Sequence, residues 1–199
     1  MEKVCQLFSG SSGNSILVSS SGHNYLVDIG VSAKKCENGL NQIGIEPDSI
    51  EGIFVTHEHG DHAKGVRVFA NRYKIPVYAS KLCYDELYRQ GFADDKKNLN
   101  IIENHIELDG IDAKAFHQSH DSIDCLGYRF NFADGRSAAV CTDTGFKMYG
   151  YVPAFTIAIS WFDSINTMSV PGKISFALSV IKPVSVQTAA LLPSAKLNL

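Results

Sequence analysis

The sequence lacks the features that mark secreted, membrane-spanning and disulfide-bonded proteins. Its five cysteines are odd in number and scattered, with no Cys-x-x-Cys spacing, which indicates reduced thiols rather than a disulfide framework. Residues 1–5 contain no apolar segment of the kind found in signal peptides. The longest apolar stretch, residues 152–162, is too short to span a bilayer. We therefore expect a cytoplasmic protein.

An excess of positive charge is also missing. The chain has 18 Lys and Arg against 21 Asp and Glu, a net charge of −3, so its composition gives no support for a nucleic-acid-binding surface. The hydrophobic content of 45 % and the charged content of 20 % are ordinary for a globular protein. A length of 199 residues predicts a single domain, residues 1–199, with a substantial core.

Histidine and charge both disappear toward the C-terminus. No histidine follows His120, and residues 151–199 contain only four charged side chains, although charged residues make up 20 % of the whole chain. Apart from a strand-like run over residues 155–162, periodicity is poor, and we predict no structure for residues 163–199. This C-terminal part is therefore atypical of the rest of the chain.

Against these absences stands one dense cluster of metal-binding side chains. Within six consecutive residues the chain places His57, His59, Asp61 and His62. An apolar core does not favour such a composition, because each imidazole or carboxylate must be desolvated and then satisfied. Neutral imidazole and carboxylate are ordinary ligands of zinc, manganese and iron. The alternative, a histidine-rich surface loop, is much less common at this density.

The residues around the cluster predict a strand, a turn and a helix. The apolar run over residues 50–55 is typical of a buried strand, and residues 63–73 have helical spacing. The cluster then lies at the carboxyl end of a strand, where open α/β folds place their sites. Asp61, near the helix start, also suits the helix dipole.

Further strands and helices follow from apolar runs and turn residues. The expected helices cover residues 32–43, with Ser32 as N-cap, and 80–90, with Gly91 as the stop signal. The other expected strands cover residues 4–8, 16–18, 25–29, 76–79, 101–108, 111–116, 127–132 and 137–142. This order predicts an α/β domain with largely antiparallel sheets covered by helices.

A two-metal site needs ligands beyond one turn, and the candidates stand after other predicted strands. His120 lies in a loop, where a ligand role is favoured, and Asp143 follows a strand, where the alternative is a turn carboxylate that bonds its own backbone. For His117 the favoured interpretation is a partly buried strand histidine. The remaining polar residues, His23, His105 and Glu58, are interpreted as solvated or structural, with Glu58 pointing away from the metals.

Together these segments resemble a known family. The pattern His57-x-His59-x-Asp61-His62, followed by His120 and Asp143 and preceded by Leu-Val-Asp-Ile-Gly at 26–30, is similar to the metallo-β-lactamase superfamily. Phe-Ser-Gly-Ser-Ser-Gly-Asn-Ser at 8–15, Ser-His-Asp at 119–121 and Thr-Asp-Thr-Gly at 142–145 resemble its YycJ/WalJ-like branch of metal-dependent exonucleases. The resemblance covers residues 3–147.

The resemblance implies an αββα four-layer sandwich with two divalent metal ions at one edge. Zn²⁺ is the first expectation and Mn²⁺ the alternative. By this resemblance, His57, His59 and His120 hold the first metal, Asp61 and His62 hold the second, and Asp143 bridges both. Asp61 also orients or deprotonates the metal-bound water, while Asp28 orients the ligands from behind. The turn formed by Ser11, Ser12, Gly13 and Asn14 is a candidate substrate-binding loop, with a plain β-turn as the equal alternative.

The pattern breaks after Asp143. The superfamily usually supplies one more histidine to the second metal from a late strand end, and this chain has none there. We therefore expect weaker occupancy of the second site, and a sandwich that is incomplete at its C-terminal end.

Three functions compete at this stage. The first is a metal-dependent phosphodiesterase, by resemblance a 5′-to-3′ DNA exonuclease using a metal-bound hydroxide, for which Lys64, Arg67, Arg72 and Lys74 offer a local basic patch. The second is hydrolysis of a small thioester, lactone or cyclic phosphodiester, because the same metals serve all of these reactions. The third is a metal-binding but inactive remnant. No protein partner is evident.

Overall fold

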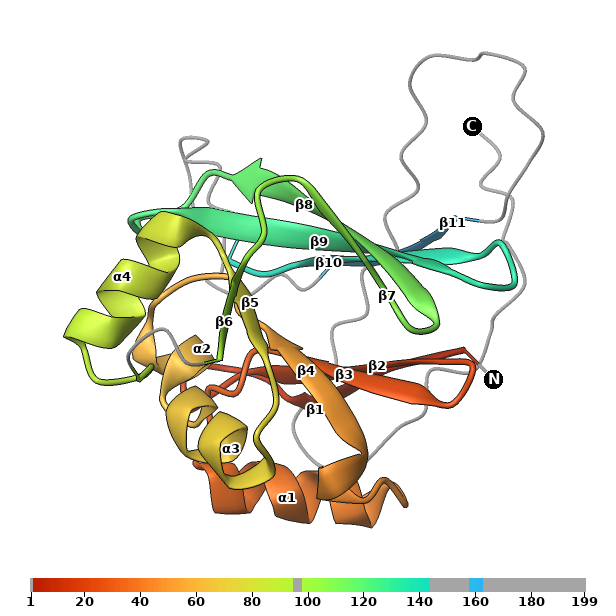
Figure 1. Cartoon of the computed structure of the whole chain (residues 1–199), viewed down its shortest axis with the longest axis horizontal. Coiled ribbons are helices and arrows are strands. Elements are labelled where there is room, and N and C mark those ends of the chain that lie inside the picture. Colours follow the sequence, from red (N-terminus) through yellow and green to blue (C-terminus); the bar gives the residue numbers. More distant parts are fainter. Residues whose placement is uncertain (1, 95–97, 144–157, 163–199) are drawn as a thin grey trace, which may run out of the picture.

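Two β-sheets face each other in the computed structural model, which describes residues 2–94, 98–143 and 158–162 (Figure 1). The first sheet has the strand order β1-β2-β3-β4-β5-β6, and the second has the order β11-β10-β9-β8-β7. Helices α1 and α3 cover the outer face of the first sheet (Figure 1). These are three of the layers expected for the αββα sandwich.

The first sheet follows the chain order from edge to edge. Its strands are β1 (Lys3–Phe8), β2 (Ser15–Ser20), β3 (His23–Val27), β4 (Ile50–Phe54), β5 (Val77–Ala79) and β6 (Leu99–Ile101). The first three pair antiparallel, whereas β3 to β6 pair parallel. The prediction of largely antiparallel sheets is therefore wrong for this half, because each connection between its parallel strands contains a helix and returns the chain to the same end.

The second sheet is antiparallel throughout. It contains β7 (His105–Leu108), β8 (Ile111–Gln118), β9 (Cys125–Phe132), β10 (Ser137–Cys141) and the backbone of β11 (Ala158–Phe162). The single strand expected over residues 101–108 is wrong. The chain leaves the first sheet after β6 and enters the second at β7, with the polar residues Glu103 and Asn104 between them. Strand β11 lies within the run expected over residues 155–162, while the remaining residues of the atypical C-terminal part lie outside the described ones.

The described helices are α1 (Ala33–Gln42), the short 3₁₀ helix η1 (Pro47–Ser49), α2 (Gly60–Ala63), α3 (Val66–Tyr73) and α4 (Lys81–Arg89). Serine side chains cap the first turns of two of them, α1 and α4. Ser32 caps α1 by accepting a hydrogen bond from the Lys35 N–H, as predicted. None of the helices in the described part of the chain is long and apolar enough to cross a membrane.

The helix expected over residues 63–73 is two helices, and Gly65 separates them. The Gly65 N–H donates to the Ile29 carbonyl. A β-carbon at this position would lie 2.2 Å from the Val31 carbonyl oxygen. Only glycine therefore allows the helical segment to approach the residues after β3 so closely.

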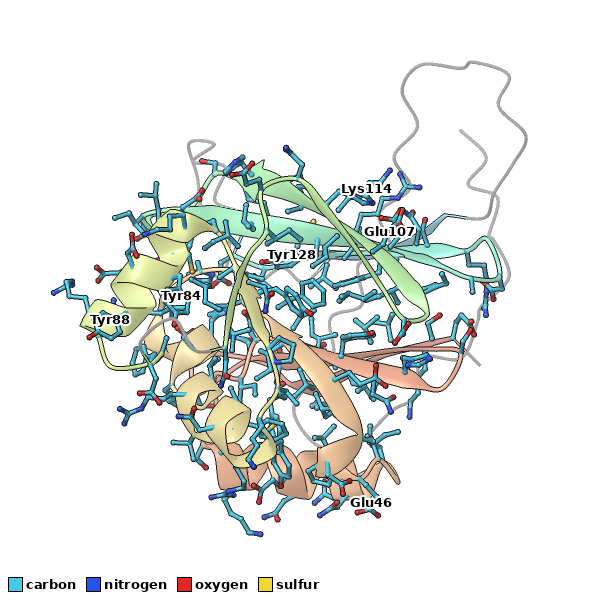
Figure 2. The ribbon with its side chains drawn as sticks, viewed as in Figure 1. Glu46, Tyr84, Tyr88, Glu107, Lys114 and Tyr128 are labelled. Atoms are coloured by element: carbon cyan, nitrogen blue, oxygen red, sulfur yellow. The ribbon has the colours of Figure 1, made fainter. Side chains whose placement is uncertain are left out.

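Alternating side chains divide the interior into two cores. Leu17, Leu26 and Ile53 point toward the helices, where they pack with residues of α1, α3 and α4. Their strand neighbours, among them Val18 and Phe54, point toward the second sheet. Figure 2 shows side chains filling the space between the sheets, with Tyr128 among them. This period of two is what pleated strands buried on both faces require.

Phe54 is the centre of the core between the sheets. Its ring lies 4.9 Å from Tyr78, 5.2 Å from Tyr128 and 5.2 Å from Phe130, measured between ring centroids. Two of these partners belong to the second sheet. The aromatic contacts of Phe54 therefore join the two sheets at the end of β4, next to the turn that carries the histidine cluster.

We predict that Phe54→Ala lowers the free energy of unfolding by about 3–5 kcal/mol, because it opens a cavity in a fully buried site. Val68→Ala on α3 is the control, since Val68 is 45 % exposed, and it should change the same quantity by less than about 0.5 kcal/mol. Urea denaturation followed by circular dichroism measures both. Equal effects of the two substitutions would contradict this account of the core.

Candidate metal centre

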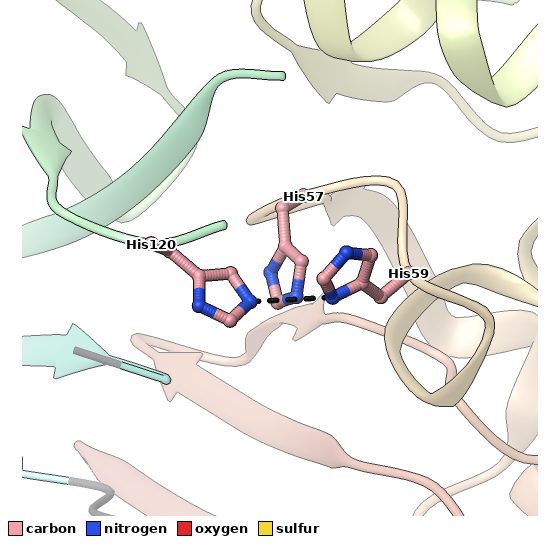
Figure 3. Close-up of side chains that lie close together, drawn as sticks. All are labelled: His57, His59 and His120. Carbon is pink, nitrogen blue, oxygen red and sulfur yellow. Dashed lines mark hydrogen bonds between the residues drawn. The ribbon is translucent and has the colours of Figure 1, made fainter. Parts of the chain in front are cut away.

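Three imidazole rings meet at the edge where β4 and β8 end (Figure 3). The turn after β4 carries His57 and His59, and the loop after β8 carries His120. Ligand atoms of the three residues lie within 4.8 Å of one another. His120 Nε2 is 3.2 Å from His59 Nδ1. The structure therefore brings together the three histidines expected to hold the first metal.

A second group of ligand atoms adjoins the first. His57, His62 and Asp143 also have ligand atoms within 4.8 Å of one another. Asp143 Oδ2 lies 2.9 Å from His62 Nε2, 3.6 Å from His57 Nε2 and 4.0 Å from His120 Nε2. Asp61 Oδ2 is 3.8 Å from His62 Nε2. The Asp143 carboxylate thus stands between the two groups, at the position expected of a shared ligand.

His57 provides the observation that tests whether the site fits a metal ion. Its side chain is fully buried, and among the described residues its Nε2 atom has no hydrogen-bond partner. Burial, together with the neighbouring imidazoles, lowers the pKa of His57 to about 2. The ring is therefore neutral and has a lone pair free for coordination, which is the form that binds metals. A metal ion would satisfy this atom.

The buried carboxylate of Asp28 orders the residues behind the ligands. Its Oδ1 atom accepts a hydrogen bond from the Thr56 N–H at 2.8 Å. Its Oδ2 atom accepts from the Thr56 hydroxyl at 2.8 Å and from His62 Nδ1 at 2.7 Å. Because Nδ1 of His62 is engaged by Asp28, Nε2 is directed toward Asp143 and the site. Asp28 therefore lies where a residue that orients the ligands is expected.

The two carboxylates also govern the charge of His62. Burial alone would lower the pKa of His62, but Asp28 and Asp143 outweigh it and raise the pKa to about 10. In the metal-free protein the ring is thus protonated at neutral pH. Coordination at Nε2 would require loss of that proton, so metal binding at His62 would release a proton to solvent.

Thr56 belongs to the candidate site, and the sequence pattern did not predict it. Its hydroxyl donates to Asp28 and lies 2.9 Å from His57 Nδ1. The Thr142 hydroxyl donates to Thr56 Oγ1 at 3.2 Å. With Nδ1 of His57 held in this way, its Nε2 faces the site. The available signal was a hydroxyl residue directly before the histidine cluster and directly after the apolar residues Ile53, Phe54 and Val55.

The loop of Ser11, Ser12, Gly13 and Asn14 divides into an exposed and a buried half. Ser11 and Ser12 are exposed. Asn14 is only 3 % exposed, and its amide nitrogen lies 3.0 Å from His62 Nε2. Gly13 packs against Gly30 so closely that a β-carbon would lie 2.2 Å from the Gly30 carbonyl oxygen. Gly13 and Asn14 thus pack beneath the ligand turn, whereas Ser11 and Ser12 face solvent, and the role of this loop in substrate binding stays a prediction.

The histidines outside the cluster have ordinary partners. His117, expected to be partly buried, has a side chain that is 72 % exposed and pairs with Asp124 at 2.8 Å. His23 pairs with Glu51 and His105 with Asp112, both at 2.9 Å.

The expected basic patch is largely engaged by other residues. Lys64 donates to the Ser12 carbonyl at 2.8 Å, and Arg67 lies 3.7 Å from Asp94. Arg72 pairs with the buried carboxylate of Glu37. Of these cations, Lys64 is the one bound to the exposed half of the Ser11–Ser12 loop.

We predict that Asp28→Asn weakens zinc binding by about 10- to 100-fold, as loss of an outer hydrogen-bond partner typically does. The NH₂ group of the new asparagine cannot accept a hydrogen bond, so at least one donor of Thr56 or His62 would lose its acceptor. Competition with a chromophoric chelator measures the affinity. The matched control is Asp48→Asn, an exposed aspartate in η1, for which the affinity should not change. An unchanged affinity in Asp28→Asn would show that the carboxylate does not orient the site.

Gly30→Ala should displace the ligand turn, because a β-carbon there would lie 1.5 Å from the Asp61 carbonyl oxygen. We expect a loss of about 1–3 kcal/mol or more in the free energy of unfolding, together with weaker zinc binding. Gly60→Ala is the control within the same turn, since its β-carbon would lie no closer than 3.7 Å to the Phe92 ring. Thermal unfolding with and without zinc compares the two variants, and equal behaviour would refute the packing argument.

Comparisons with known proteins agree with this arrangement. A model of the Beta-lactamase superfamily domain matches residues 23–175. Over 157 residues the chain is 35 % identical to the Exodeoxyribonuclease WalJ of Streptococcus pneumoniae, covering 75 % of this chain and 58 % of the relative. Over 142 residues it is 34 % identical to the Exodeoxyribonuclease YycJ of Bacillus anthracis, covering 70 % and 53 %.

The fold has counterparts among solved structures. A metallo-beta-lactamase from Cronobacter sakazakii (Enterobacter sakazakii) matches with a TM-score of 0.63 at 18 % identity, covering 75 % of this chain and 65 % of that chain. This match confirms the αββα class of the fold. The chain spans only 58 % and 53 % of the two curated relatives it matches. The family model and the 35 % identity to WalJ show that the chain belongs to the metallo-β-lactamase superfamily, in its YycJ/WalJ-like branch.

Proposed function

We propose that this chain is a metal-dependent phosphodiesterase that degrades DNA as a 5′-to-3′ exonuclease in the cytoplasm. The observation that carries the proposal is the buried, unpartnered Nε2 atom of His57 beside the Asp143 carboxylate. The names of the two curated relatives, both exodeoxyribonucleases, support DNA as the substrate. The small-molecule hydrolase and the inactive remnant remain outcomes of the test below.

The proposed ligand sets follow from the two groups of atoms. His57, His59 and His120 would hold the first metal, Asp61 and His62 the second, and Asp143 would contact both. Zn²⁺ suits this mixture of imidazole and carboxylate, with Mn²⁺ as the alternative. When bound, such paired ions polarise a phosphoryl oxygen and activate water at neutral pH. We expect lower occupancy at the second site, since the sequence offers no histidine after His120.

Asp61 is the proposed catalytic residue among the acidic side chains of the site. Its side chain is 29 % exposed, whereas that of Asp143 is 13 % exposed. A carboxylate that reaches both solvent and the site can accept a proton from an attacking water molecule, a role typically worth 10²- to 10⁴-fold in rate. Asp28 and Thr56, which are buried behind the histidines, hold ring orientation and do not meet the substrate.

The exposed loop tip supplies the proposed phosphate contacts. Ser11 and Ser12 carry hydroxyl groups at the surface, and the Lys64 ammonium group is bonded to the Ser12 carbonyl. A cation beside two hydroxyl groups suits a phosphate of the DNA backbone. This contact would give the chain a local positive site despite its net charge of −3.

The test compares the wild-type chain with Asp61→Asn on 5′-phosphorylated DNA and on a small aryl phosphodiester, with Zn²⁺ or Mn²⁺ added. With excess metal we expect two bound ions by mass spectrometry, the second at lower occupancy, and degradation of DNA that Asp61→Asn slows by about 10²- to 10⁴-fold. Asp48→Asn is the charge-matched control and should retain full activity. Turnover of the small ester alone would favour the second function. Absence of turnover with one metal or none would favour the remnant.

A further inference from the structure

Glu58 is a buried carboxylate that the proposed mechanism does not use. It stands between the two ligands His57 and His59 in the sequence, yet it faces away from them. Its side chain is 6 % exposed, and its Oε1 atom accepts a hydrogen bond from the Ile123 N–H at 3.0 Å. Ile123 lies three residues after His120, in the same loop between β8 and β9. Glu58 therefore links the ligand turn of the first sheet to the His120 loop of the second.

The loop has a second attachment at its far end. The Leu126 N–H, near the start of β9, donates to the Thr56 carbonyl at 2.9 Å. The two bonds hold the loop at Ile123 and Leu126, on the C-terminal side of His120. The Ile123 side chain is 55 % exposed. Asp124, the next residue of the loop, pairs with His117 of β8 at 2.8 Å, which is a contact within the second sheet's own hairpin. The backbone bond from Ile123 to Glu58 instead ties the loop to the ligand turn.

We propose that Glu58 is a positioning residue, which sets the affinity of the first metal by holding His120 against His57 and His59. The inference rests on the proposed ligand role of these three histidines. In this role Glu58 does not coordinate the metal itself. The carboxylate acts on the metal only through the Ile123 backbone and the loop that carries His120.

The cost of burying Glu58 argues against a purely structural role. Its Oε2 atom is buried, and among the described residues it has no hydrogen-bond partner. After burial itself, the Glu58 charge is among the causes that raise the pKa of the Cys83 and Cys125 thiols, which places it near two buried, uncharged groups. A carboxylate with one hydrogen bond in such surroundings destabilises the fold relative to an apolar side chain of similar size. Stability alone would favour an apolar residue here.

A positioning role for Glu58 predicts that its replacement lowers metal affinity without lowering stability. Glu58→Met should leave the unfolding midpoint of the metal-free protein unchanged or raise it. The same substitution should weaken zinc binding at the first site by about 10- to 100-fold, the usual cost of losing an outer partner. Glu58→Gln keeps an oxygen that accepts from the Ile123 N–H, and it should retain affinity within about threefold of the wild type.

The partner of the bond can be tested separately. Ile123→Pro removes the N–H that Glu58 accepts and should weaken zinc binding as Glu58→Met does. Ile123→Ala is the matched control, because it keeps the N–H and truncates only an exposed side chain. Combining Glu58→Met with Ile123→Pro should weaken binding no further than either change alone, since both remove the same bond.

The experiment titrates metal-free protein with Zn²⁺ against a chelator, and follows Co²⁺ absorption as a second report on ligand geometry. The binding step that disappears in His59→Ala identifies the first site. Equal first-site affinity in Glu58→Met and wild type would overturn the inference while leaving the proposed function intact. Failure of the wild type itself to bind zinc at that step would overturn both. Loss of stability and affinity together in Glu58→Met, without recovery in Glu58→Gln, would also reject the positioning role.

Discussion

The candidate site depends on one buried carboxylate, that of Asp28. It accepts three hydrogen bonds, two from Thr56 and one from His62, and so fixes the end of β4 relative to the end of β3. Asp28 has a positive φ of 61°, a conformation that aspartate tolerates better than most residues. The ring orientations of His57 and His62 both follow from this contact, one through the Thr56 hydroxyl and one directly. Without the Asp28 carboxylate, these three donors would be buried unpaired, which is far more costly than losing surface bonds.

The topology explains why ligands so far apart in sequence meet. Strands β3 and β4 run parallel, so their carboxyl ends share an edge. Strands β8 and β10 each pair antiparallel with β9 and therefore also end together. Stacking of the two sheets on the aromatic core around Phe54 brings these edges face to face. On the side of the first sheet, the candidate metal ligands all lie on the turn after β4. On the side of the second sheet, His120 and Asp143 follow the ends of two separate strands. Close backbone packing at Gly13, Gly30 and Gly65 lets the ligand turn lie directly against the residues that follow β1 and β3.

Local features of the sequence predicted much of this, and long-range packing accounts for what they missed. Neighbouring residues were enough to predict strand β4, the N-cap at Ser32 and the dense cluster at His57–His62. The break at Gly65 is not, because it depends on the Ile29 and Val31 carbonyls across the fold. The split between β6 and β7 was hidden because their apolar residues read as one run. The burial of Asn14 was hidden for a similar reason: Gly, Ser and Asn indicate a turn, but which side of that turn is buried is decided by contacts of Asn14 with Asp61 and His62.

The crossing of the chain from β6 to β7 has a thermodynamic consequence for the site. The cluster residues before this crossing lie on the turn that follows β4 of the first sheet, and both His120 and Asp143 follow strands of the second sheet. The ligands are thus complete only when the two halves of the sandwich have docked. An ion held by both halves would act as a removable cross-link between them, and it would stabilise the docked state in proportion to the logarithm of its free concentration. Metal supply would then control how long the interface between the sheets stays closed, as well as the chemistry at its edge.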